Sequence, residues 1–154
     1  MSTTPEMLEI RGLARDFAAA ELRPHAERWD ADRALDDGVP AKIAELGFFG
    51  MLVPEDSGGM GFDQATYLGA LEELAWGEPA TALLVAQTVI AADVLVRFGG
   101  SDHQTTIADL AAGNRTGCIA FAPDASDGYA DPGASAVQHA DGWKFSGSSP
   151  WVTN

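Results

Sequence analysis

The stretch that decides the fold covers residues 44–61 and reads AELGFFGMLVPEDSGGMG. Its apolar centre lies between two helix-breaking residues, Gly47 and Pro54. Gly47 suits a left-handed cap after a short helix over residues 40–46. The glycine-rich end, residues 57–61, needs backbone angles that other residues avoid. It has neither the strand–loop–helix frame nor the lysine of a phosphate-binding loop, so the pattern predicts a plain tight turn.

A long helical pattern precedes this stretch. Thr3 and Glu6 form a capping-box start, and apolar residues then recur at helical spacing from Ile10 to Trp29. Pro24 lies inside the pattern, where it removes a backbone donor and is expected to kink or break the helix.

Three further helices are predicted after the stretch. Asp63 caps the first, which ends at Gly77, and a short one covers residues 103–112 and closes at Gly113. The helix between them, 79–98, is apolar nearly all round and is expected to be buried on most sides.

A membrane span is the competing interpretation of residues 79–98, since about 20 apolar residues suffice. The polar and charged side chains of Gln87, Thr88, Asp93 and Arg97 argue against it, because such groups are costly in lipid. We therefore expect no membrane span.

The pattern changes from helical to extended after residue 115. Strands are predicted at 118–121, 136–139, 143–145 and 151–153, with a hairpin turn at 140–142. So few strands leave open edges and a poorly covered sheet face, which indicates a domain cut short. The predicted fold is mostly α with a C-terminal β segment: an α-helical domain over 1–115, then the beginning of a β-domain over 116–154.

Composition narrows the class of partner. The 154 residues are 46% hydrophobic, enough for a packed core, and carry a net charge of −14. This charge argues against nucleic acid and anionic membrane surfaces, which attract basic proteins. The single cysteine, Cys118, and an N-terminus without a signal peptide fit a cytoplasmic protein. Seven arginines against two lysines hint at a bacterial source.

No self-contained catalytic or metal-binding set appears in the sequence. The three histidines and Cys118 lack partners at metal-ligand spacing. Glu72 and Glu73 are adjacent, so they point about 100° apart on a helix and form no acid–base pair. One of the two is expected to face solvent. We therefore predict no catalytic residue and no metal ligand in this chain.

The order of short motifs resembles the acyl-CoA dehydrogenase family over nearly the whole chain. The motifs that carry the resemblance lie at 15–18, 22–24, 29–30, 44–50, 53–61, 71–75, 98–100 and 110–113. The resemblance implies a helical bundle, then a β-barrel or sandwich domain, then a second helical domain. Together these enclose FAD and a fatty acyl-CoA. A glutamate of the last domain removes the α proton, and the flavin accepts a hydride from the β carbon.

Flavin contacts follow from the same resemblance. Trp151 and Thr153 match the family's flavin-side strand, where the tryptophan packs beside the isoalloxazine and the threonine binds its polar edge; alternatively, the tryptophan covers the end of a sheet. Phe121 and Ala122 occupy the other flavin strand, where the family usually has Thr and Glu. A flavin-binding hydroxyl is then missing at Phe121.

Substrate contacts are implied along residues 79–98, which would line the acyl-chain pocket. Leu83, Ala86, Gln87 and Ile90 fall on one helical face, and the small Ala86 leaves room for a tail. Ser126 is assigned to the substrate side of the second flavin strand. Ordinary helix packing explains the helical residues equally well.

Three functions remain open. The chain is part of an FAD-dependent acyl-CoA dehydrogenase, for fatty acid or steroid degradation, that makes a 2,3-enoyl-CoA with the base on a missing part or a second polypeptide. It would then be inactive alone and share FAD with that partner. Alternatively, it is a non-catalytic, degenerate subunit of a heteromeric enzyme of this family. Flavin monooxygenases and oxidases share the architecture, and fold alone does not fix the reaction.

Overall fold

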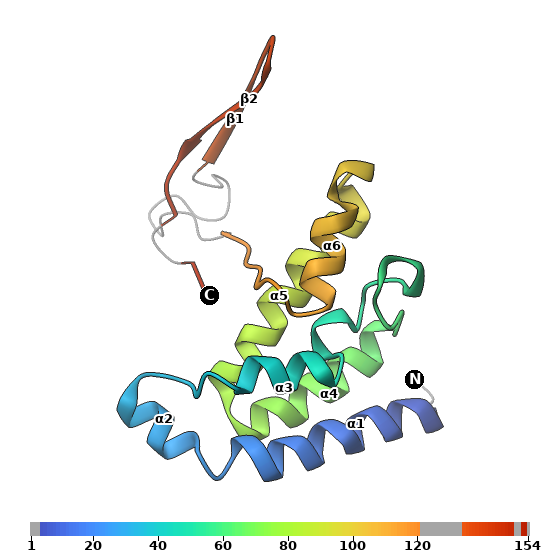
Figure 1. Cartoon of the computed structure of the whole chain (residues 1–154), viewed down its shortest axis with the longest axis vertical. Helices are drawn as coiled ribbons and strands as arrows, with labels where there is room; N and C mark the ends of the chain where they lie inside the picture. The colour runs from blue at the N-terminus through green and yellow to red at the C-terminus, as the bar shows by residue number, and fades with distance from the viewer. Residues whose placement is uncertain (1–3, 121–133, 150–151, 154) are drawn as a thin grey trace.

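The computed structural model describes residues 4–120, 134–149 and 152–153. Within these residues, six α-helices form one body and a β-hairpin projects from it (Figure 1). The α-helices are α1 (Pro5–Phe17), α2 (Ala26–Asp32), α3 (Val39–Glu45), α4 (Gln64–Gly77), α5 (Pro79–Phe98) and α6 (Gln104–Ala111). Shorter turns are the π-helix Ala18–Leu22 and the 3-10 helices Phe48–Gly50, Glu55–Ser57 and Ser101–His103. The strands are β1 (Ala134–His139) and β2 (Gly142–Gly147). The predicted class, mostly α with a C-terminal β segment, is confirmed.

The first helix begins one residue later than the sequence predicted. Thr4, not Thr3, is the N-cap, and its hydroxyl accepts a hydrogen bond of 3.2 Å from the Met7 N–H. The reason is that Pro5 occupies the first helical position, so the cap falls on the residue before it. Thr3 itself lies outside the described residues.

The predicted break at Pro24 is confirmed. After Phe17 the helix widens into the π-helical turn Ala18–Leu22, in which the Arg23 N–H donates to the Ala18 carbonyl over 2.9 Å. The chain then turns, and α2 starts at Ala26. Because proline lacks the N–H that would continue the ladder, the helix ends and restarts in a new direction.

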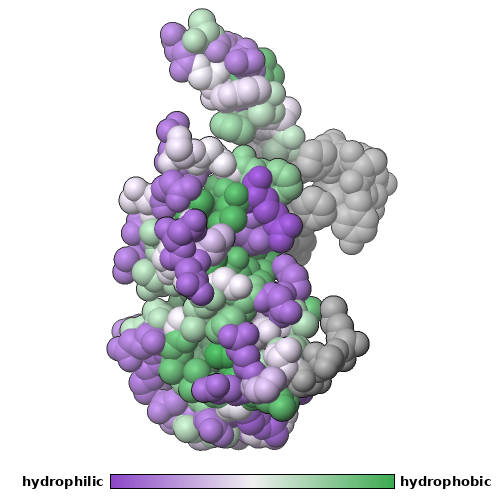
Figure 2. Space-filling view, turned by 90° about the vertical axis from the view of Figure 1, so that its right-hand side faces the viewer, coloured by the Kyte–Doolittle hydropathy of each residue, from purple (hydrophilic) through white to green (hydrophobic). Residues whose placement is uncertain are grey.

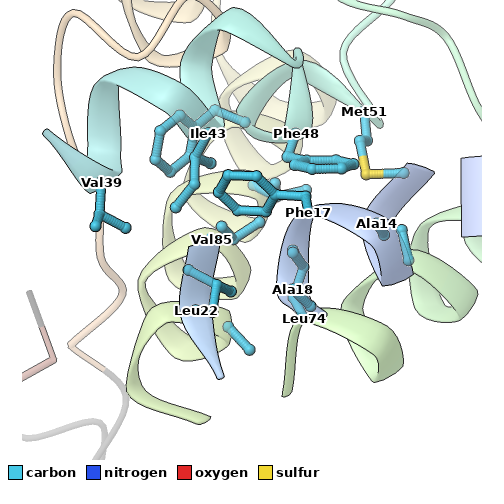
Figure 3. Close-up of a cluster of buried hydrophobic side chains, with 14 of the residues drawn as sticks. Ala14, Phe17, Ala18, Leu22, Val39, Ile43, Phe48, Met51, Leu74 and Val85 are labelled. Atoms are coloured by element: carbon cyan, nitrogen blue, oxygen red, sulfur yellow. The ribbon is translucent and has the colours of Figure 1, made fainter. Parts of the chain in front are cut away.

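The core forms where α1, α4 and α5 meet the apolar stretch after α3. Phe17 and Phe48 pack with ring centroids 6.1 Å apart, and Ile43, Leu74 and Val85 close around them (Figure 3). These side chains are nearly or fully buried. Residues from α1, α3, α4, α5 and the turn after α3 therefore share this cluster, and a second one forms between α5 and α6.

The 57–61 loop folds back onto the apolar stretch. The N–H groups of Met60, Gly61 and Phe62 donate to the carbonyls of Gly50, Val53 and Met51 over 2.8–2.9 Å. Gly47, Gly58 and Gly61 have the positive φ values, 76°, 89° and 65°, that the sequence predicted at such breakers. The apolar residues of the stretch thus fill the core, and the loop at 57–61 is a tight turn bonded to them.

Helix α5 is less buried than its composition predicted. Its buried residues form one stripe, namely Thr81, Ala82, Val85, Thr88, Val89 and Ala92. On the other side Leu83, Ile90 and Val94 are exposed. The helix is long and apolar enough to cross a membrane by length and composition alone, with a third of its most apolar window buried. Here it packs against α4 and α6, and its outer face is uncovered.

The hairpin confirms two predicted strands. β1 and β2 pair antiparallel with Ala136 opposite Phe145 and His139 opposite Gly142, and both strands are exposed along their whole length. The predicted strand at 118–121 is wrong for residues 118–120, which form none; Phe121 lies outside the described residues. The Ile119 N–H bonds to the Gln87 side chain on α5, as the N–H of the preceding Gly117 does to Thr88, so these two groups do not pair with a neighbouring strand. Residues 152–153 are not strand either, and Trp151 lies outside the description.

Candidate functional site

The outer face of α5 presents exposed apolar side chains along the length of the helix. Pro79 starts the helix, and the Glu78 carboxylate caps it by accepting from the N–H groups of Ala80 and Thr81 at 2.9 and 2.6 Å. The buried stripe of the helix, which includes Val85 and Val89, sets which side faces the core. The face then presents Leu83 and Ile90, which remain 45% and 40% exposed.

The four α5 residues predicted to contact substrate do share one side of the helix. Ala86 and Gln87 are half-buried between the exposed Leu83 and Ile90, outside the buried stripe. Val94 continues the face by a further turn and is 39% exposed. Val94 is not among the predicted contacts, although its place four residues after Ile90 is a visible signal. Whether this face binds an acyl chain stays a prediction.

Gln87 has a second contact that the sequence did not indicate. Its Oε1 accepts a hydrogen bond of 3.3 Å from the backbone N–H of Ile119, in the segment that leaves the helical body. The next residue, Thr88, accepts one of 3.2 Å from the Gly117 N–H through its hydroxyl. The side-chain amide of Gln87 therefore faces the segment around Ile119.

Three of the four predicted flavin contacts, Phe121, Ala122 and Trp151, lie outside the described residues. The predicted substrate contact Ser126 also lies outside them. Thr153 is described and is half-buried in irregular backbone. Figure 2 shows exposed apolar surface between polar residues on one side of the helical body. The structure therefore brings the α5 residues together, while the flavin-side predictions remain predictions.

Three described carboxylates have lowered pKa values, each because of a hydrogen bond to its charged form. The pKa of Glu73 is lowered, first by the hydrogen bond from Arg11 and next by the one from Arg15. The pKa values of Asp36 and Asp63 are also lowered, by the Arg28 guanidinium and by the Thr66 backbone N–H respectively. A base that removes a carbon-bound proton at neutral pH needs a pKa near 7, so these groups are better suited to structure.

Glu72 and Glu73 behave as the helical geometry predicted. The Glu72 side chain is 69% exposed, while that of Glu73 is 10% exposed and bonded to two arginines. Among the described residues no group of three metal-ligating side chains occurs. Glu73 therefore serves the packing of α1 against α4, while Glu72 lies at the surface.

Comparison with known proteins identifies the architecture. The family described as acyl-CoA dehydrogenase, N-terminal domain, matches residues 4–114. The chain belongs to the acyl-CoA dehydrogenase family. Its relatives include the mitochondrial short-chain specific acyl-CoA dehydrogenase of Sus scrofa, 30% identical over 94% of this chain and 36% of the relative. The (2S)-methylsuccinyl-CoA dehydrogenase of Cereibacter sphaeroides is 31% identical over 97% of this chain and 28% of its own length.

Solved structures of acyl-CoA dehydrogenases have the same fold. A glutaryl-CoA dehydrogenase in complex with glutaryl-CoA superimposes with a TM-score of 0.88 at 25% identity, covering 99% of this chain and 40% of the other. Glutaryl-CoA dehydrogenase from Mycobacterium smegmatis gives 0.84 at 26% identity, over 97% and 40%. The chain thus spans well under half the length of the relatives that it matches.

Family membership implies FAD as the cofactor. The four residues predicted to contact a flavin would bring few side-chain donors to it. Of the four predicted contacts, the Thr153 hydroxyl and the Trp151 indole N–H are polar side-chain groups, whereas Phe121 and Ala122 have none. The carbonyl oxygens and ring nitrogens of an isoalloxazine need several donors. These residues thus fit only part of a flavin site.

Proposed function

We propose that the chain is the N-terminal part of an FAD-dependent acyl-CoA dehydrogenase that oxidises an acyl-CoA to a 2,3-enoyl-CoA. The catalytic base and most of the flavin donors come from the remainder of the enzyme, on a C-terminal part or a second polypeptide. The observation that carries this proposal is the uncovered apolar face of α5 in a domain of this family. We place the enzyme in the cytoplasm, because the single cysteine of this chain fits a reducing compartment.

The role of this chain is to bind and orient. Leu83, Ala86, Ile90 and Val94 would form one wall for the acyl tail, and burial of that tail would bring roughly 0.8 kcal/mol per methylene. FAD, when bound, supplies the acceptor for the substrate hydride. The apolar wall excludes water from the thioester end of the tail, so that competing reactions are suppressed.

The relatives narrow the substrate to a class. Their names specify short-chain acyl-CoA and (2S)-methylsuccinyl-CoA, and one solved relative holds glutaryl-CoA. All are CoA thioesters with short acyl groups. We extend only this shared feature, a CoA thioester with a short acyl group, to the chain, and propose that the acyl group contacts the α5 face.

A direct test begins with the complex purified from its own source. Native mass spectrometry is expected to show this chain together with a second polypeptide, or with the rest of its own sequence, and with FAD. The complex is then assayed for dye reduction that depends on an acyl-CoA.

In this complex Ile90→Glu is expected to lower kcat/KM at least tenfold, because it buries a charge in the acyl wall. Leu68→Glu, at an exposed position on α4, is the matched control and is expected to leave the rate unchanged.

A second candidate, a non-catalytic subunit, is favoured by the sequence at Phe121 and Ala122. If this chain shapes an assembly without holding flavin, the complex has flavin for its intact subunits only. Phe121→Thr then leaves the flavin content unchanged. In the enzymatic case the restored hydroxyl raises flavin affinity. Oxygen consumption in place of dye reduction would indicate an oxidase or monooxygenase instead.

A further inference from the structure

The segment that leaves the helical body, residues 116–120, lies in direct contact with α5 and α6. A Cβ atom at Gly117 would stand 2.7 Å from the Ala91 Cβ and 3.1 Å from the Leu110 Cδ2. The first of these distances is too short for real side-chain atoms. Gly117 therefore permits a close approach that any larger residue at this position would prevent.

Two hydrogen bonds hold the same segment from one side. The Gly117 N–H donates to the Thr88 Oγ1 at 3.2 Å, and the Ile119 N–H donates to the Gln87 Oε1 at 3.3 Å. The acceptors are neighbours on α5, and the donors are two residues apart in the leaving segment. Thr88 is fully buried, so its hydroxyl meets the segment without competition from solvent.

These contacts also account for polar residues in an otherwise apolar helix. A threonine on the buried stripe of α5 costs desolvation unless it finds a partner. A valine at that position would fill the same space without this cost. The hydroxyl is explained by the backbone group that it binds, and the same reasoning applies to the amide of Gln87.

We propose that Gln87 and Thr88 are positioning residues that fix the direction in which the chain leaves the helical domain. We call the pair, with Gly117 against α5, the exit latch. The segment that it holds leads into residues 121–154, which include the predicted flavin contacts. Any effect of this direction on the position of the predicted flavin contacts rests on the proposed function. The exit latch itself is a property of this chain and is tested without flavin.

The first test measures amide hydrogen exchange by NMR on the full 154-residue chain. In the wild type the amides of Gly117 and Ile119 are expected to be protected. Thr88→Val, which keeps the side-chain shape, is expected to speed exchange at Gly117 roughly fivefold, the equivalent of one net hydrogen bond. Gln87→Met is expected to do the same at Ile119. Thr88→Ser and Gln87→Glu retain an acceptor oxygen and are expected to restore protection.

Thr81→Val is the matched control. Thr81 is also a fully buried threonine of α5, but its hydroxyl bonds to Glu78 at 2.6 Å and not to the leaving segment. Its replacement is expected to lower global stability without selective exchange at Gly117. Equal effects of Thr81→Val and Thr88→Val at Gly117 would overturn the proposal, as would exchange of both amides at free-peptide rates in the wild type.

Cys118 offers a second readout, because it is the one cysteine of the chain, is exposed and lies between the two held amides. A nitroxide attached to its thiol reports the nanosecond motion of this segment by electron paramagnetic resonance. The spectrum is expected to sharpen in Thr88→Val and Gln87→Met and to stay broad in Thr88→Ser and Thr81→Val. Identical spectra in all variants would contradict the exit latch, whatever the flavin content of the enzyme.

Discussion

The Arg15 guanidinium on α1 donates a hydrogen bond of 2.6 Å to the carboxylate of Glu73 on α4. Arg11 donates to the other oxygen of the same carboxylate at 2.7 Å, one helical turn earlier. Arg15 also stacks on Trp76, with its guanidinium carbon 3.5 Å from the ring centroid. Glu73 is nearly buried, so these contacts hold α1 and α4 in register. These two helices have the most extensive contact of any helix pair described.

Glu73→Gln is expected to lower the free energy of unfolding by about 1–3 kcal/mol at pH 7, because two arginines lose a charged partner in a nearly buried place. The folded pKa of Glu73 lies below its usual 4.5, first because of the hydrogen bond from Arg11. Its contribution is therefore complete above about pH 4.5 and is lost as the pH falls through the lower, folded pKa. Urea unfolding of both proteins from pH 7 to pH 3 measures this.

Glu72→Gln is the control for that experiment. Its carboxylate bonds to Arg11 at 2.9 Å, but its side chain is 69% exposed, so its removal is expected to change stability little. A difference between wild type and Glu73→Gln that stays constant down to pH 3 would contradict the assignment of the titration to Glu73.

The two glycines of α4 are expected to respond in opposite ways to alanine. At Gly77 a Cβ would stand 2.8 Å from the Ala18 Cβ and 3.1 Å from the Leu22 Cβ, so Gly77→Ala should cost about 1–3 kcal/mol by overpacking. At Gly69 the nearest atom is the Arg11 Cδ at 3.9 Å, an ordinary contact. Gly69→Ala should therefore stabilise the helix by roughly 0.5–1 kcal/mol. Thermal unfolding of Gly77→Ala and Gly69→Ala measures both changes. Equal shifts of Tm in the two variants would refute the close approach at Gly77.

Tyr67→Phe is expected to leave stability unchanged or to raise it by up to about 1 kcal/mol. The hydroxyl of Tyr67 is buried in the core without a hydrogen-bond partner, and burial raises the pKa of this phenol. Removing an unpartnered polar atom relieves a desolvation cost while the ring still packs. Chemical denaturation measures the change. A loss above about 1 kcal/mol would mean that the hydroxyl is bonded, for example to a buried water.

Most of the helical body is predictable from local signals. Pro24, Gly47, Asp63, Pro79 and Gly113 each mark a helix end or break through backbone chemistry that acts within a few residues. Such signals survive in any context, because a missing N–H or a positive φ is a property of one residue. The cap at Thr4 was missed by one position because Pro5, also a local signal, outweighs the capping-box pattern.

The features that the sequence missed depend on distant partners. The segment 118–120 is apolar enough for a strand, yet the Ile119 N–H bonds to Gln87, 32 residues earlier, and the N–H of the preceding Gly117 bonds to Thr88. The exposed face of α5 was unexpected for the same reason: composition shows that a helix is apolar, but not which neighbours are present to cover it. Pairing across the chain is a tertiary property that periodicity does not encode.

Ala86→Leu is expected to change substrate preference in the assembled enzyme. Ala86 is half-buried on the α5 face between Leu83 and Ile90, so a larger side chain there would occupy the space of an acyl tail. We expect kcat/KM for hexanoyl-CoA to fall roughly tenfold relative to that for butyryl-CoA, since misfit of one methylene is worth about 1–3 kcal/mol. Ala80→Leu, at an exposed position in the first turn of α5, is the control and should leave the ratio unchanged. Equal losses for both substrates in Ala86→Leu would show that Ala86 supports the fold and does not face the tail.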